Sequence, residues 1–384
     1  MGQAGLIDRI FSIKGDSDFD ELALEVFRFQ YGNNAVYHSF CHALGRTPET
    51  VHCLEQVPFL PVEMFKHHRV VSFEGEAEAV FQSSGTTSSV TGKTGAQGSG
   101  TTSSAIPDGR SDKAPGGEPA RASHFVKDLK VYERSFTEGF ARFYGDPSRY
   151  CVLALLPSYL EREGSSLVYM AGSLIKQSGH PDSGFYLDEY DRLMEVVRRL
   201  THQGKNLLLL GVSFALLDLA EAHPTKMKKA IVMETGGMKG RRPELVREAL
   251  HQRLMEAFGL DRVHSEYGMT ELLSQAWSDG EGRFVCPPWM RVLIRDSNDP
   301  LCITDGRRAG GINVVDLANL YSCSFLATQD LGKRCQTGAG DQTRGIRKEG
   351  KETSVACFEV LGRFDHSDVR GCNLMVSAGS TGGR

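Results

Sequence analysis

The residue types best suited to chemistry lie together in one short segment, residues 264–271, which reads His-Ser-Glu-Tyr-Gly-Met-Thr-Glu. Thr270 offers a hydroxyl to a phosphate, Glu271 offers a hard oxygen ligand suited to Mg²⁺, and Tyr267 offers a flat ring to a base. A strand pattern precedes this segment, and a helical pattern follows from Leu272. We therefore expect a strand-to-helix turn, where free backbone N–H groups meet an anion. The alternative is an ordinary solvent-facing turn.

A second polar segment follows a short predicted strand at residues 79–81. It combines a glycine, which permits close approach of the backbone, with four hydroxyl side chains that donate to phosphate oxygens. Its members are Ser83, Ser84, Gly85, Thr86 and Thr87. Read alone, such a segment is as readily a plain linker. Two phosphate-suited segments in one chain favour a nucleotide site.

In their order along the chain, these segments resemble the signatures of the adenylate-forming superfamily, which contains acyl-CoA synthetases and luciferases. Residues 233–237, 327–332 and 362–365 continue the resemblance. Within the superfamily the chain most resembles the acyl-protein synthetases of bacterial bioluminescence, from about residue 6 to residue 376 with two insertions left aside. It departs from the superfamily at Ser88, where the phosphate segment usually ends in glycine.

The resemblance implies an α/β fold: a large adenylate-forming domain with largely parallel sheets covered by helices, and a β-rich subdomain. It implies ATP and Mg²⁺ as cofactors, with the metal on Glu271. It also implies that Asp330 holds the ribose hydroxyls and that Arg363 lies in the hinge motif before a small C-terminal domain. His124, where the resemblance resumes after an insertion, is a candidate for contacting a phosphate or the acyl carboxylate, or else a packing residue. The other residues implied to contact the nucleotide are Gly236, Gly237, Tyr267 and Gly268.

Cys372 is the most specific single candidate. The C-terminal domain that usually carries a catalytic lysine is expected to be missing or truncated. In the acyl-protein synthetases a C-terminal cysteine takes the acyl group from the adenylate, and Cys372 lies in a similar tail. Arg370, two residues away, would favour the reactive thiolate. The alternative is a small buried apolar side chain, the usual fate of a free cysteine.

Composition excludes several other classes of protein. The chain has 384 residues, enough for a large core with a subdomain, and a net charge of −4 without a basic cluster, which argues against a nucleic-acid partner. No apolar run approaches the ~18 residues of a membrane span, and the N-terminus lacks the features of a secretion signal. The nine cysteines form no Cys-x-x-Cys pair, so we expect reduced thiols and a cytoplasmic location.

Changes in composition divide the chain into six parts. Two are polar insertions that we expect to be disordered, because they cannot bury enough apolar surface to offset their ordering entropy. The first repeats the phosphate segment, but only the copy at 84–89 follows a strand, so we prefer it to the copy at 99–104. The parts are a helical region at 1–78, the phosphate loop at 79–88, an insertion at 89–122, the adenylate-forming α/β core at 123–332, an insertion at 333–356, and a strand with a short tail at 357–384.

The core alternates buried-strand runs with helical patterns, as in a largely parallel sheet covered by helices. Ligands of such sheets lie at the carboxyl ends of the strands, where Gly236 and Tyr267 fall. In the N-terminal part, Asp16 is expected to cap a helix. In and after the core we expect strands at 151–156, 207–210, 230–233, 262–265, 291–295 and 312–315, and helices at 188–202 and 243–258.

These features predict an enzyme that activates a fatty or other carboxylic acid with ATP to acyl-AMP and passes the acyl group to a protein thiol. A first alternative is a ligase that gives the acyl group to CoA or a carrier protein. A second is a degenerate homologue that binds nucleotide or a partner without turnover, which Ser88 and the interrupted phosphate loop favour.

Overall fold

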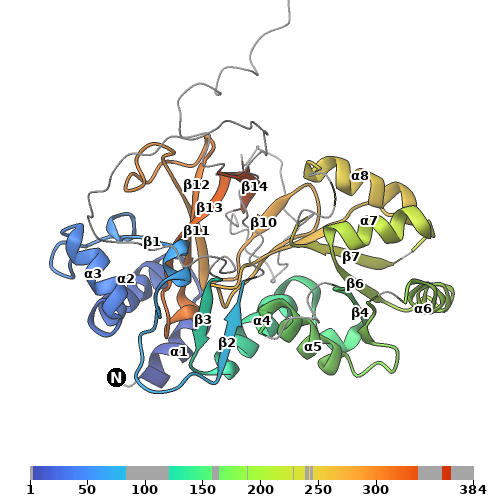
Figure 1. The fold of residues 1–384 in the computed structure, drawn as a ribbon, viewed down its shortest axis with the longest axis horizontal. Coiled ribbons are helices and arrows are strands. Elements are labelled where there is room, and N and C mark those ends of the chain that lie inside the picture. The colour runs from blue at the N-terminus through green and yellow to red at the C-terminus, as the bar shows by residue number, and fades with distance from the viewer. Residues whose placement is uncertain are drawn as a thin grey trace, which may run out of the picture.

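The centre of the molecule is one long mixed sheet, parallel at one end and antiparallel at the other (Figure 1). The computed structural model describes residues 3–83, 121–157, 164–187, 189–227, 229–237, 242, 245–335 and 357–364. Within these residues the expected α/β architecture is confirmed.

The parallel end of the sheet carries five strands, and two adjacent interior ones are buried at every residue. Unbroken apolar runs of this kind are typical of parallel strands covered on both faces. In spatial order the strands are β8 (His264–Tyr267), β7 (Ala230–Thr235), β6 (Leu207–Val212), β4 (Cys151–Leu155) and β5 (Gly184–Phe185).

Five helices accompany the parallel strands. In Figure 1, two of them, α7 (Ser213–Ala222) and α8 (Arg247–Phe258), lie side by side on one side of the sheet. Another two, α4 (Leu129–Tyr144) and α5 (Ser166–Ser178), lie on the other side. The fifth, α6 (Tyr190–His202), presents its apolar positions to β6.

The antiparallel end of the sheet forms the expected β-rich part. Its strands pair in the order β11 (Met290–Arg295), β12 (Gly310–Asp316), β13 (Phe325–Arg334), β14 (Cys357–Arg363), β10 (Arg283–Val285) and β9 (Ala276–Ser278). Because β9 pairs with β8, both halves belong to one hydrogen-bonded sheet. A short strand, β1 (Leu60–Pro61), runs parallel to β13.

The N-terminal part carries three helices among its described residues, α1 (Gln3–Phe11), α2 (Asp16–Asn33) and α3 (Ala35–Ala43). The apolar stripe of α2 is buried, and its Gln30 donates to the carbonyl oxygen of Asn319 at 3.1 Å. Asp16 is the first residue of α2 rather than its cap, which is Gly15. A carboxylate in the first turn still stabilises the helix through its dipole. Short 3₁₀ turns are η1 (Leu54–Gln56), η2 (Val62–Lys66), η3 (Pro147–Arg149) and η4 (Leu317–Asn319).

A separate hairpin flanks the first insertion. It pairs β2 (Ala79–Gln82) with β3 (Ser123–Val126), and the backbone N–H of Ser83 donates to the carbonyl oxygen of Ala122 at 3.0 Å. The described residues on either side of the first insertion are therefore paired neighbours. The disorder expected for both insertions concerns residues that lie almost wholly outside the described part of the chain.

The helix expected from Leu272 is wrong. The chain turns after β8 and returns as the antiparallel strand β9, so the motif lies on a strand-to-strand connection. Leu272, Leu273, Ala276 and Trp277 match helical spacing, but both faces of this segment are buried, and a fully buried strand cannot be told from a helix by periodicity. Smaller shifts affect β8, which starts at His264, and α8, which starts at Arg247.

The cysteines also depart from expectation. Cys335 and Cys357, at the end of β13 and the start of β14, form a disulfide with their Cα atoms 5.4 Å apart. The expectation that all nine thiols are reduced is therefore wrong for these two, because residues far apart in sequence become neighbours through strand pairing.

Among the described helices, none is both long and apolar enough to cross a membrane.

Candidate functional site

The turn that follows β8 is held in place by buried side chains from two other parts of the chain. His124, on β3, contacts the carbonyl oxygen of Thr270 through Nδ1 at 2.8 Å and Oδ1 of Asn319 through Nε2 at 3.0 Å. Asn319 donates from Nδ2 to the carbonyl oxygen of Glu271 at 2.8 Å. Consecutive carbonyl groups of the motif are thus bound by side chains, which fixes the direction of the Thr270 and Glu271 side chains.

His124 acts on the motif by position. Burial lowers the pKa of His124 to about 4, against the opposing effect of its contacts to Thr270 and Asn319. The ring is therefore neutral near pH 7 and carries one N–H, so it donates to only one of its two oxygen neighbours. His124 is 1% exposed, so the structure favours the packing alternative over contact with phosphate or acyl carboxylate.

The far end of the turn is held by Asp316 at the end of β12. Its Oδ2 accepts from the backbone N–H groups of Leu273 and Ser274 at 2.8 and 2.9 Å. These two amides belong to the turn where we expected free N–H groups for an anion. They are taken by a protein carboxylate instead, so anion binding depends on the amides and hydroxyls that remain.

Tyr267, Asp330 and Arg363 come together although they lie on three different strands. The hydroxyl of Tyr267 donates to Asp330 Oδ2 at 2.8 Å, and Arg363 Nε donates to Asp330 Oδ1 at 3.3 Å. Asp330 is 8% exposed, whereas the side chain of Arg363 is 68% exposed. A ribose diol fits this arrangement, because Asp330 is an orientated acceptor and its neighbour Arg363 has a mostly exposed side chain.

The ring of Tyr267 is less available than expected for stacking on a base. It is 8% exposed and packs edge-on against Phe284 and Phe358, with ring centroids 5.9 and 5.5 Å apart. Burial, followed by the charge of Asp330, raises the pKa of Tyr267 well above its usual value, so the hydroxyl remains a donor.

Glu271 is 8% exposed and lies close enough to Arg363, Lys66 and Glu63 to respond to their charges. Burial raises the pKa of Glu271 to about 7, while Arg363 and Lys66 favour its ionised form and Glu63 opposes it. A nearly buried carboxylate with hard oxygens and an incomplete set of charged partners suits Mg²⁺, which would replace the lost hydration. The Thr270 side chain is partly exposed next to it. Thr270 and Glu271 therefore fit the metal and phosphate roles predicted for them.

The remaining predicted residues lie around this turn or outside the described chain. Gly236, at the end of β7, has a φ of 69°, which favours glycine, and its carbonyl oxygen accepts from Ser213 at 3.4 Å. A Cβ added at Gly237 would meet none of the described atoms within 4 Å. Ser83 accepts from the N–H of Ala122 at 3.0 Å. Gly268 is exposed. Outside the described residues lie Ser84, Gly85, Thr86, Thr87 and Cys372.

Sequence reasoning missed several residues that the fold brings to the site. Asp316 was detectable as a polar residue at the end of an apolar strand, and Asn319 follows on η4, but nothing in the sequence linked either residue to the motif. Lys66 and Glu63 lie on η2, more than 200 residues earlier in the chain. Glu266, inside the motif itself, was overlooked because its neighbours matched known roles.

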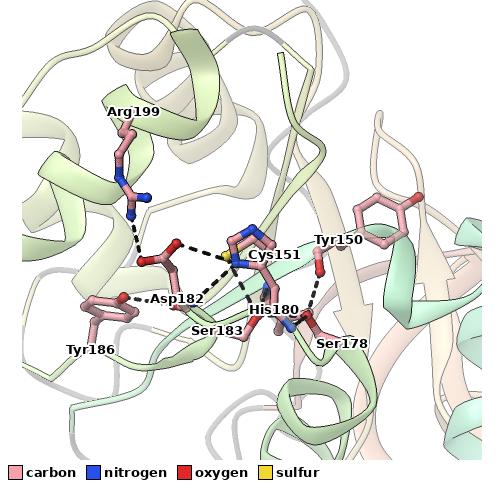
Figure 2. A network of polar contacts seen from close by, with 9 residues as sticks. Tyr150, Cys151, Ser178, His180, Asp182, Ser183, Tyr186 and Arg199 are labelled. Carbon is pink, nitrogen blue, oxygen red and sulfur yellow. Dashed lines mark hydrogen bonds and ion pairs between the residues drawn. The ribbon is translucent and has the colours of Figure 1, made fainter. Parts of the chain in front are cut away.

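A second group of polar side chains lies at the opposite, amino ends of β4 and β5 (Figure 2). Arg199 donates to Asp182 at 2.6 Å, and the hydroxyl of Ser183 lies 3.7 Å from the sulfur of Cys151. Burial raises the pKa of Cys151 to about 11, so its thiol is protonated and unreactive near neutral pH. His180 Nδ1 accepts from the N–H of Asp182 at 3.2 Å. This group fastens the loop between α5 and β5, and it lies away from the carboxyl ends where ligands of parallel sheets bind.

Comparison with known proteins supports the fold. No protein-family model matches the sequence, and no curated protein matches it. Among solved structures, 2-hydroxyisobutyryl-CoA ligase in an open conformation with its acyl-adenylate and CoA is similar over 92% of this chain and 72% of the ligase, with a TM-score of 0.62 and 13% identity. The same ligase in its thioesterification state is similar over 94% of this chain and 71% of the ligase, with a TM-score of 0.62 and 14% identity. The ligase in its postadenylation state is similar over 91% of this chain and 69% of the ligase, with a TM-score of 0.60 and 13% identity.

The chain has the fold of an adenylate-forming ligase. At this level of identity the likeness concerns the path of the backbone and not the chemistry of the side chains. The site geometry described above therefore has to carry the functional argument.

Proposed function

We propose that this protein activates a carboxylic acid with ATP, forming acyl-AMP and releasing pyrophosphate. The observation that carries the proposal is the convergence at one turn of a candidate ribose acceptor, Asp330, and a candidate metal ligand, Glu271. Arg363 donates to Asp330, and its charge also favours the ionised form of Glu271, so both carboxylates lie near the same guanidinium group. A nucleotide held by Asp330 therefore places its phosphates toward Glu271. Similar solved structures contain an acyl-adenylate, which supports the same reaction.

The residues of this chain act mainly by holding the nucleotide. Asp330 accepts from the ribose hydroxyls while Tyr267 fixes one of its oxygens, and Arg363 moves aside. Ser83 to Thr87 and Thr270 bind the phosphates, and the acid carboxylate attacks the α-phosphate. Mg²⁺, bound by Glu271, would supply charge stabilisation at the phosphates. His124 and Asn319 keep the turn rigid, which preserves the alignment.

ATP–pyrophosphate exchange across a panel of carboxylic acids tests this function. We expect exchange that depends on one class of acid, and we expect Asp330→Ala to lose most of it through weaker nucleotide binding. Nucleotide binding without exchange for any acid would contradict the proposal. It would favour the alternative that the protein is a degenerate homologue that binds nucleotide without turnover, as Ser88 suggests.

For the second half-reaction we propose that Cys372 accepts the acyl group as a thioester. The resemblance of its tail to the acyl-protein synthetases supports this. Cys372→Ser should keep pyrophosphate exchange, because adenylation needs no thiol, and should abolish hydroxylamine-sensitive labelling by radioactive acid plus ATP. Continued labelling of the variant would place the acceptor elsewhere.

Transfer to CoA is the second candidate for that step. It is favoured by the similar structures that hold an acyl-adenylate together with CoA. Formation of acyl-CoA by a wild-type protein that never becomes labelled would decide for this candidate.

A further inference from the structure

Three side chains from neighbouring strands form a row on the sheet face toward α4, and the proposed nucleotide chemistry uses none of them. They are Thr235 on β7, Glu266 on β8 and Trp277 on β9. Thr235 donates from its hydroxyl to Glu266 Oε2 in a short hydrogen bond, and Glu266 and Trp277 are directly paired across β8 and β9. A Cβ added at Gly139 of α4 would lie 3.7 Å from Trp277 Nε1, so α4 covers the row.

The opposite face of the same strands is already satisfied. Glu234 on β7 accepts from Ser213 at 3.0 Å and pairs with Arg247 and His251 of α8 at 3.3 and 3.5 Å. Ser265 on β8 contacts the His251 ring at 3.4 Å. The polar groups beneath α8 thus have partners within the protein. The row beneath α4 can be compared with them.

In and beside the row beneath α4, two buried polar atoms lack hydrogen-bond partners among the described residues. Trp277 is 1% exposed and Gln275 is 6% exposed, yet Trp277 Nε1 and Gln275 Oε1 have no hydrogen-bond partner among the described residues. A Cβ added at Gly268 would collide with Glu266 Oε1 and lie 3.4 Å from Gln275 Cγ, so Glu266 and Gln275 flank the same glycine. Burial of unpartnered donors and acceptors is costly, so such groups mark a place where a ligand completes the set.

Glu266 provides the acceptor at the centre of the row. It is partly exposed, and within the described chain no lysine or arginine forms an ion pair with it. Burial and then the charge of Glu234 raise the pKa of Glu266 to about 7, although the bond from Thr235 opposes this. Burial, followed by the charge of Glu266, raises the pKa of Tyr132 on α4 above its usual value, so the two side chains lie near each other.

Position relates the row to the reaction. Glu266 immediately precedes Tyr267, whose side chain points to the other face and binds Asp330. Glu266 therefore lies across the strand from the ribose group, at the carboxyl end of β8, where the acid has to approach the phosphates. A hydroxyl both donates and accepts, so it can satisfy Glu266 or Gln275 as well as Trp277 Nε1. An ammonium group can only donate, and an alkyl chain can do neither.

We infer that Glu266, Trp277 and Gln275 line the acid-binding part of the site and select a short carboxylic acid that carries a hydroxyl group. The inference rests on the proposed adenylation and assigns its substrate class. It replaces the fatty acid expected from the sequence, because an unsubstituted chain would leave two buried atoms, Trp277 Nε1 and Gln275 Oε1, without hydrogen-bond partners.

The test is ATP–pyrophosphate exchange with short hydroxy acids, unsubstituted acids of the same length, amino acids and a long fatty acid. For wild type we expect kcat/KM for the best hydroxy acid to exceed that of its unsubstituted partner by at least about 10-fold, since the site pairs with the hydroxyl. Glu266→Gln and Trp277→Phe should each reduce this ratio toward one by lowering exchange with the hydroxy acid. Glu138→Gln, the same change on the half-exposed outer part of α4, should leave the ratio unchanged.

The outcomes separate the two proposals. Exchange with unsubstituted or fatty acids that is equal to or greater than exchange with hydroxy acids would overturn the inference and keep the adenylation. A preference for hydroxy acids that survives in Glu266→Gln and in Trp277→Phe would also overturn it. Absence of exchange with every acid would overturn both. If Trp277→Phe fails to fold, the ratio measured for Glu266→Gln decides.

Discussion

At the scale of single residues, the site depends on side chains whose roles come from their surroundings. Glu271 is an ordinary carboxylate by type, but burial makes its ionised form costly unless a cation is bound. His124 is a possible catalyst by type, but its buried ring supports the Thr270 carbonyl. Chemistry and support are thus distinguished by exposure and partners.

The first residue-scale prediction concerns Glu271. Glu271→Gln should lower pyrophosphate exchange by roughly 10²-fold or more, because it removes one strong charge stabiliser at the phosphates. The loss should appear mainly as a higher Mg²⁺ concentration needed for half-maximal exchange, because the metal is held less tightly. Glu248→Gln, at an exposed position of α8, serves as the control. Exchange at the wild-type rate in Glu271→Gln would remove this residue from the site.

At the scale of elements, the β2–β3 hairpin makes the first insertion separable. Its strands are paired through Gln82 and Ser123, and the Ser83 hydroxyl accepts from Ala122. We expect excision of residues 89–120, which keeps Ala122 and the preferred phosphate segment, to change the melting temperature by less than about 3 °C. The segment also lacks apolar periodicity, so few packed contacts should be lost. A fall of about 10 °C in a thermal melt would show that the insertion is packed.

A second element-scale prediction concerns the join between β13 and β14. The disulfide closes the chain between Cys335 and Cys357, and β13 and β14 carry Asp330 and Arg363. Cross-linking over a separation of 22 residues should stabilise the fold by about 3 kcal/mol. Cys335→Ala/Cys357→Ala should therefore melt at a lower temperature than the oxidised protein. Mass spectrometry of the non-reduced protein provides the control, and an unchanged melting temperature in an oxidised sample would contradict the prediction.

At the scale of the whole molecule, buried carboxyl groups couple folding to pH. The pKa of Glu266 is about 7 in the folded protein, above the value near 4.5 of an unperturbed glutamate. A raised folded-state pKa contributes stability that is complete below about pH 4.5 and is lost as the pH rises toward 7.

This coupling predicts the pH dependence of a variant. Glu266→Gln cannot ionise, so its melting temperature relative to wild type should rise between about pH 4.5 and pH 7 and stay constant above that. Thermal melts of both proteins across this range provide the measurement, with Glu138→Gln as a surface control. A difference in melting temperature that does not vary with pH would show that burial does not raise the pKa of Glu266.

The sequence by itself determined the local features of this protein. The apolar runs of β4, β6 and β7, the helical pattern of α2 and the order of the polar segments follow from neighbours along the chain. Local patterns of this kind, with the resemblance they support, predicted the α/β architecture and the β-rich end. The contacts of Tyr267 and Arg363 with Asp330 came only from the structure.

Only the tertiary structure decided how these elements meet. The segment after Glu271 became strand β9, because pairing with β8 and burial on both faces outweighed a helical spacing. Cys335 reached Cys357 through the register of β13 and β14, and Glu266 reached Trp277 through that of β8 and β9. Sheet order and register are set by contacts between residues far apart in sequence, which local patterns do not encode. For that reason the sequence supplied candidate nucleotide residues, while the row beneath α4 became visible only in the folded molecule.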